Sequence, residues 1–239
     1  MLSVVALIPS APVMVPELAT GAASELTELT AAVMTAATGL PQRWIAVGVG
    51  PTDEVISPEA VGTFGGYGAD VRVTLAPDSG GEPARLPLCA LITGWVRGQA
   101  NPSARAEVRV VSVGHEAAAA TGRGRALRAE LDAVAEPIGV LIVADGANTL
   151  TPSAPGGYDP DSVPGQEALD HALATGDAAA LTTLPASVVG VGYQVLAGLV
   201  EPAPVAAREL YRGAPYGVGY FVGVWAPAGR SAATGESTE

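Results

Sequence analysis

Short apolar runs with the character of β-strands alternate with alanine-rich stretches of helical periodicity along most of the chain. This alternation is typical of a sheet covered by layers of helices, because each helix buries its apolar stripe against one face of the sheet. The pattern predicts strands at 3–8, 43–50, 70–75, 107–114 and 139–144, and helices at 22–38, 86–99, 116–135, 165–177 and 186–200. Two further β-rich segments flank a turn at 212–217. From the alternation of strands and helices we expect an α/β protein.

The sequence pattern indicates a single domain. Its 239 residues contain no internal repeat and no change of composition that would mark a linker. We expect a single domain over 1–227. The last stretch, 228–239, has no apolar periodicity and is predicted to be a disordered tail.

Composition excludes several classes of function. The net charge is −12, and the twelve basic residues, all arginine, are dispersed, so no basic stripe is present to bind nucleic acid. Because lysine is absent, a Schiff-base mechanism is excluded. Cys89 is the single cysteine and lies in the apolar stretch LPLCALI, so we interpret it as a buried structural thiol.

The first eighteen residues are apolar enough to suggest a signal peptide. They lack a basic region, and Pro9, Pro12 and Pro16 would break the apolar helix that such a peptide needs. No run reaches the roughly 18 apolar residues of a membrane span. We therefore expect a cytoplasmic protein with no membrane partner.

Polar residues follow two of the predicted strands directly. The apolar run IGVLIV is followed by ADGANTLTPSAPGGYDP, which contains Asp145, Asn148 and Thr149. The strand ending in GVG is followed by a segment that contains Thr52 and Asp53. In α/β proteins the loops at the carboxyl ends of strands commonly hold the binding site. These side chains are therefore pocket candidates.

Other motifs favour structural readings. His115 follows a strand and His171 lies in a predicted helix; with no closely spaced histidine pair, we interpret both as surface or helix-end residues rather than metal ligands. The segment TGRGRALR could form an anion-binding nest, but without a complete phosphate-binding motif we favour a helix start. Asp159 and Asp161 also indicate a helix start.

Three segments together resemble one family. VVALIPSAPVMVPEL is similar to the "PHPPLLVPE" pattern of the class III extradiol ring-cleavage dioxygenase subunit-B superfamily, ADGANTLTPSAPGGYDP to its "SGDLSHRLTPDAPGGYDP", and YRGAPYGVGYFVGVW to its "YEGPFGVGYLVA". The matches are in the family's order and span nearly the whole chain. The resemblance implies a three-layer αβα sandwich around a central mixed sheet, and in active members an Fe(II) ion at one edge, held by two histidines and a carboxylate.

The residues that would hold iron differ here. The resemblance places Ser10 and Asn148 where the family's motifs have histidines, and Thr52 where a third histidine falls in a strand-end "SPH". The family's glutamate ligand should lie near 187–192, where the sequence has no acid. Neutral oxygen donors cannot replace imidazole and carboxylate around Fe(II), so we expect no iron site, no metal and no cofactor.

The leading hypothesis is therefore a metal-independent small-molecule-binding protein or pseudoenzyme on this fold. Its pocket candidates are Ser10, Thr52, Asp53, Asp145 and Asn148. Alternatives are an enzyme with altered chemistry, using Asp145 or Asp53 as a general base or hard-metal ligand, and a structural partner subunit. True aromatic ring cleavage remains the reading that the fold would suggest, and a homodimer is possible.

Overall fold

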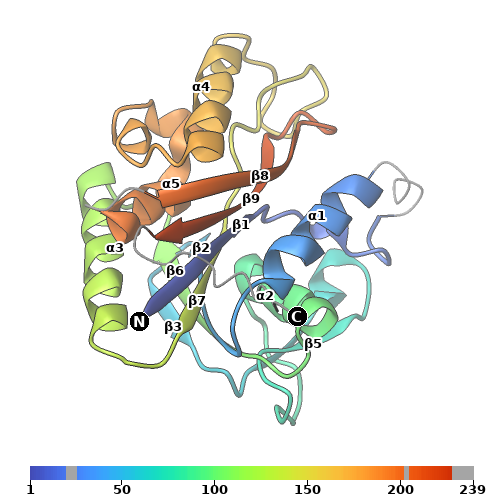
Figure 1. Ribbon diagram of the computed structural model, residues 1–239. Helices are drawn as coiled ribbons and strands as arrows, with labels where there is room; N and C mark the ends of the chain where they lie inside the picture. Colours follow the sequence, from blue (N-terminus) through green and yellow to red (C-terminus); the bar gives the residue numbers. More distant parts are fainter. Residues whose placement is uncertain (20–25, 202–204, 228–239) are drawn as a thin grey trace, which may run out of the picture.

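The computed structural model describes residues 1–19, 26–201 and 205–227. They form one α/β domain with a seven-stranded mixed sheet between two layers of helices (Figure 1). The strands of this sheet are β1 (Leu2–Ile8), β2 (Arg43–Gly50), β3 (Glu54–Ile56), β6 (Arg105–Ser112), β7 (Ile138–Val143), β8 (Val205–Gly213) and β9 (Tyr220–Pro227). A separate two-stranded sheet pairs β4 (Val61–Thr63) with β5 (Arg72–Thr74). The α/β prediction is confirmed.

Four neighbouring strands of the central sheet are parallel. The order across the sheet is β3-β6-β2-β7-β1-β9-β8, in which β6, β2, β7 and β1 run the same way and β3, β9 and β8 run antiparallel to their neighbours. The carboxyl ends of the four parallel strands therefore meet at one edge of the sheet.

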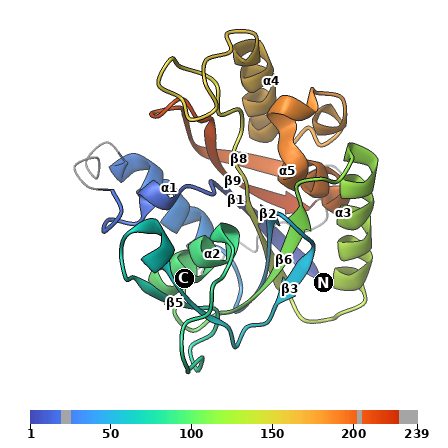
Figure 2. The same cartoon turned by 180° about the vertical axis from the view of Figure 1, so that it is seen from behind.

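Helices cover both faces of the sheet. The α-helices are α1 (Thr27–Thr38), α2 (Leu88–Ala100), α3 (Ala117–Asp132), α4 (Ser162–Thr175) and α5 (Ala186–Val200). The first two lie on one face and the other three on the opposite face (Figures 1 and 2). Every residue of β7 is buried, as expected for a parallel strand packed on both sides. In the described part of the chain, no helix has the length and apolar character needed to span a bilayer.

Short elements are where the structure departs from the sequence prediction. The strand predicted at 70–75 is only three residues long as β5 and belongs to the small sheet, not the central one. Strands β3 and β4 were not predicted, because three residues are too few to establish a period. The predicted helix at 22–38 is observed from Thr27. Residues 22–25 of this predicted helix and the predicted tail at 228–239 lie outside the described residues.

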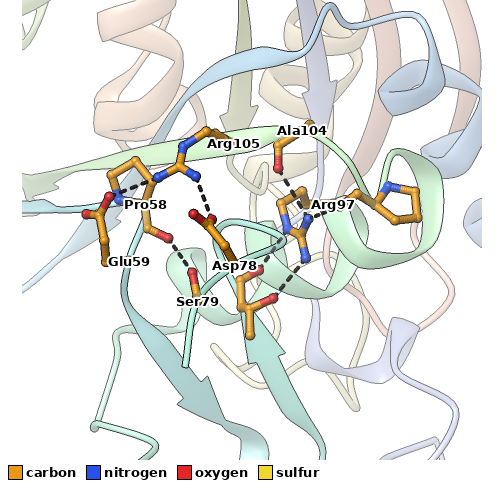
Figure 3. Close-up of polar contacts among 9 residues, drawn as sticks. Pro58, Glu59, Asp78, Ser79, Arg97, Ala104 and Arg105 are labelled. Carbon is orange, nitrogen blue, oxygen red and sulfur yellow. Dashed lines mark hydrogen bonds and ion pairs between the residues drawn. The ribbon is translucent and has the colours of Figure 1, made fainter. Parts of the chain in front are cut away.

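A buried arginine ties the small sheet to the amino end of β6. Arg97 in α2 is 5% exposed, and its guanidinium donates to the Thr74 carbonyl (2.9 Å) and hydroxyl (2.9 Å). It also donates to the carbonyls of Pro102 (2.6 Å) and Ala104 (3.2 Å), and Arg105 beside it pairs with Asp78 and Glu59 (Figure 3). These bonds join three segments that are distant in sequence, so this cluster is structural.

The helices α3 and α5 cross in close contact through glycines. A Cβ atom at Gly124 would lie 2.1 Å from the Val195 carbonyl oxygen, and one at Gly198 would lie 2.0 Å from the Thr121 carbonyl oxygen. Real Cβ atoms do not approach backbone this closely, so both positions require glycine. The TGRGRALR segment is thus the interior of a helix rather than its start, and its second glycine is needed for packing.

We predict opposite effects from alanine at the two glycines of α3. Gly124→Ala forces the two helices apart and should lower the free energy of unfolding by about 3 kcal/mol. Gly122→Ala, where no atom lies within 4 Å of the added Cβ, should raise it by about 0.5–1 kcal/mol through helix propensity. Urea denaturation measures both, and a Gly124→Ala protein as stable as wild type would contradict the proposed crossing.

Candidate functional site

The carboxyl edge of the parallel strands brings Ser10 and Asp145 together. Ile8 pairs with Val143 at the ends of β1 and β7, so the residues two positions further along lie side by side. The Ser10 backbone N–H donates to Asp145 Oδ1 at 2.9 Å. These two residues, 135 positions apart in sequence, form the centre of the candidate site.

The carboxylate of Asp145 has few groups around it that stabilise its negative charge. It is partly buried, and burial raises its pKa from 3.8 to about 6, although the hydrogen bond from the Ser10 amide acts in the opposite direction. Within the described residues its second oxygen, Oδ2, accepts no hydrogen bond, and no arginine or histidine pairs with it. A group with a pKa near neutrality and a free oxygen can accept a ligand's hydrogen bond or a proton.

Two buried tyrosines adjoin this carboxylate. Tyr193 in α5 donates its hydroxyl to the Ala144 carbonyl at 3.0 Å, and Tyr220 begins β9, which pairs with β1. Burial, and next the negative charge of Asp145, raise the pKa of each tyrosine above its ordinary value. Both phenols therefore stay protonated at neutral pH and keep the surroundings of Asp145 uncharged.

Gln166 of α4 holds the loop that carries Asp145. Its Oε1 accepts from the Ala147 amide at 2.8 Å, and its Nε2 donates to Asp170 Oδ1 at 2.8 Å. The side chain fills the space that glycines leave: a Cβ at Gly146 or Gly219 would lie 2.2 or 2.4 Å from it. The loop also pairs with the start of β9, because the Gly146 amide donates to the Gly219 carbonyl at 2.8 Å.

Of the other pocket candidates, Asn148 and Thr52 lie at the same edge but do not bond to the central pair. Asn148 is exposed, and its side chain lies against Gly156, whose amide donates to the Asn148 carbonyl at 2.9 Å. Thr52 is exposed in the turn that follows β2. Among the described residues, neither side chain makes a hydrogen bond to Ser10 or Asp145.

Asp53 belongs to a separate charged cluster. It accepts from the Ser112 amide at 2.9 Å and contacts His115 Nε2 at 2.9 Å and the Arg123 guanidinium. The Ser112 hydrogen bond is the largest cause that lowers the pKa of Asp53. Desolvation opposes it, and the interactions with His115 and Arg123 add to the lowering, so the pKa is lowered overall. His115 therefore stands just before α3 with a carboxylate partner, in agreement with the interpretation of a helix-end residue.

Metal-binding side chains are sparse in the ranges that the structure describes. No group of three or more His, Cys, Asp or Glu residues there is placed to hold an ion. Cys89 is buried in the first turn of α2, where its Cβ would touch a Cβ at Gly48 at 2.2 Å. Burial raises the pKa of this thiol to about 11, so it is an unreactive packing residue.

Sequence reasoning missed Tyr220 and Gln166 as parts of this site. Tyr220 lies in the GVGYFVGVW segment, which indicated a strand, and Gln166 lies in a predicted helix. No local signal marks either residue, because both reach Asp145 or its loop through contacts between distant elements. Gly146 and Gly219 are the signal that could have indicated close packing there.

Comparison with known proteins bears on the fold. No family model matches the chain, and no curated protein matches it. Among solved structures, an uncharacterized protein, JW3007 from Escherichia coli K12, has a similar fold with a TM-score of 0.55 and 12% sequence identity. The alignment covers 94% of this chain and 99% of that chain. This likeness concerns the fold of the whole domain alone.

We predict that Asp145→Asn stabilises the protein at neutral pH. Between pH 3.8 and about 6 the native state holds the Asp145 proton that the unfolded state releases, so stability falls as pH rises through this window. Asparagine keeps the Ser10 hydrogen bond without the charge. At pH 7 it should raise the free energy of unfolding by about 1–3 kcal/mol, and the gain should vanish below pH 3.8.

Urea denaturation at a series of pH values measures this difference. Glu82→Gln is the matched control, because Glu82 is an exposed carboxylate with no ion pair in the described structure. It should leave stability unchanged across the same range. If Asp145→Asn changes the free energy of unfolding equally at every pH, or lowers it at pH 7, the charge of the carboxylate is stabilised by its surroundings and the prediction is wrong.

Proposed function

We propose that this protein binds a small hydroxyl-bearing molecule at the carboxyl edge of its sheet, without a metal, and that Asp145 accepts the ligand's hydrogen bonds. The observation that carries the proposal is the partly buried carboxylate of Asp145, whose Oδ2 has no partner in the described residues. A carboxylate held this way binds hydroxyl donors strongly, because charge-assisted hydrogen bonds are stronger in a poorly solvated site.

The donor set at this edge supports a metal-independent role. Ser10, Thr52 and Asn148 supply neutral oxygens where the dioxygenase superfamily that the sequence resembles has histidines. Asp145 is one carboxylate, and imidazole nitrogens that would complete an Fe(II) site are not beside it: His115 pairs with Asp53. These residues do not fit a resident iron ion, so we assign no step to one.

A proton-transfer enzyme is the second candidate function. The pKa of about 6 at Asp145 favours it, since a general base works best when its pKa lies near the operating pH. If the NMR spectrum of a probe incubated with the protein shows conversion to a product, the result supports catalysis over binding alone. A homodimer was one possibility from the sequence, and sedimentation velocity can test it.

Catechol, the aromatic diol that the resemblance suggests, is the probe for the binding site. We expect it to bind to the protein anaerobically in the presence of EDTA, as measured by isothermal titration calorimetry. Affinity should fall as pH is lowered through about 6, because the protonated carboxyl no longer accepts both hydroxyls. Asp145→Asn should weaken binding about tenfold through loss of the charge-assisted bonds.

Matched controls separate hydrogen bonding from simple burial of a ring. 1,2-Dimethoxybenzene has the same ring without hydroxyl donors and should bind at least about tenfold more weakly than catechol. Glu82→Gln should bind catechol as wild type does. Equal affinity for the two probes, or no effect of Asp145→Asn, would overturn the proposal.

A further inference from the structure

A cavity lies on the other side of β2 from Asp145, between α3 and the outer strands β3 and β6. Its volume is about 330 Å³, within the range of small-molecule sites. The floor is apolar and is formed by side chains of the sheet and of the helices that pack on it. It consists of Val47, Val111, Leu127 and Val195. At the rim Val55 is 60% exposed, so a molecule in this cavity would also cover apolar surface that is now in water.

The carboxyl-edge end of the cavity holds the Asp53 cluster. Asp53 and Arg123 line the cavity, and His115 contacts both of them. The His115 Nε2 atom lies 2.9 and 3.0 Å from the two oxygens of Asp53 and 3.0 Å from Arg123 Nε. Arg123 Nη2 in addition donates to Asp53.

These contacts of His115 conflict with one another. A ring nitrogen that carries a proton can donate to Asp53, but it then faces the Arg123 N–H without accepting from it. A ring nitrogen without a proton can accept from Arg123, but it then faces two carboxylate oxygens. In either protonation state one close contact is unfavourable, so the cluster is not a self-sufficient ion pair.

An anionic group entering from the cavity would remove this conflict. It can accept from Arg123 Nε in place of the imidazole, and His115 can then donate its Nε2 proton to Asp53 alone. Carboxylates suit this position, because they match the fork of a guanidinium with two parallel hydrogen bonds.

The far end of the cavity sets the direction of the ligand. There Arg109 is already paired with two carboxylates, Glu107 at 2.5 Å and Glu130 at 2.6 Å. A further anion would be repelled more strongly at that end than beside Arg123, which pairs with one carboxylate, Asp53. The valine and leucine floor between the ends suits an apolar body.

We propose that this cavity is a binding site for a small monocarboxylate with an apolar body. The carboxylate binds Arg123 at the carboxyl edge, and the body lies along Val47, Val111 and Leu127 toward Arg109. The site shares no residue with the one around Asp145, and the inference does not depend on the function proposed there.

Binding of 4-phenylbutyrate and of its uncharged amide, 4-phenylbutanamide, tests the proposal by isothermal titration calorimetry. We expect the acid to bind at least about tenfold more tightly than the amide, because only the acid makes charge-assisted bonds to Arg123. Arg123→Gln should weaken binding of the acid about tenfold or more and leave the amide unaffected. Ala126→Phe, at an exposed cavity-lining position of α3, should weaken binding of both.

Two controls isolate the site. Arg208→Gln removes an exposed arginine from β8, the opposite edge strand, and should not change either affinity. Asp145→Asn should also leave binding of the acid unchanged, so failure here is distinguishable from failure at the other site. Equal affinity for acid and amide, an ineffective Arg123→Gln, or no binding of the acid at millimolar concentration would overturn the proposal.

Discussion

Burial of the parallel strands on both faces is the constraint on which the rest of this structure depends. Every residue of β7 is buried, so helices must cover each side of it and polar side chains can appear only beyond its ends. The tight packing relies on glycine at close approaches, as where Gly48 meets Cys89 and where Gly124 meets α5. At the carboxyl edge of these strands, ionisable side chains from distant segments come together.

The two aspartates at this edge are treated in opposite ways by their surroundings. Asp53 lies at the surface, where the Ser112 amide, His115 and Arg123 lower its pKa. Asp145 has one amide partner and two protonated tyrosines nearby, so burial dominates and raises its pKa. An uncompensated buried carboxylate is costly for stability, and such costs are concentrated at functional sites.

Much of the architecture could be predicted from periodicity, because long elements repeat their pattern several times. The strands around 43–50 and 139–144 and the helices around 86–99 and 186–200 are observed within a few residues of the predicted bounds. Three-residue strands such as β3 carry no such pattern. The small sheet is held by Arg97, which donates two hydrogen bonds to Thr74, 23 positions away, and nothing in the sequence around Arg97 indicates that contact.

The sequence by itself determined which residues follow the buried strands, and so placed Ser10, Thr52, Asp53, Asp145 and Asn148 at one edge. It also determined that histidine, cysteine and lysine are scarce there. Only the tertiary structure decided that Ser10 bonds to Asp145 while Asp53 pairs with His115 and Arg123. The reason is physical: the charge state of a carboxylate depends on which donors lie within hydrogen-bond distance and on how much water remains, and both are set by strand order and helix packing.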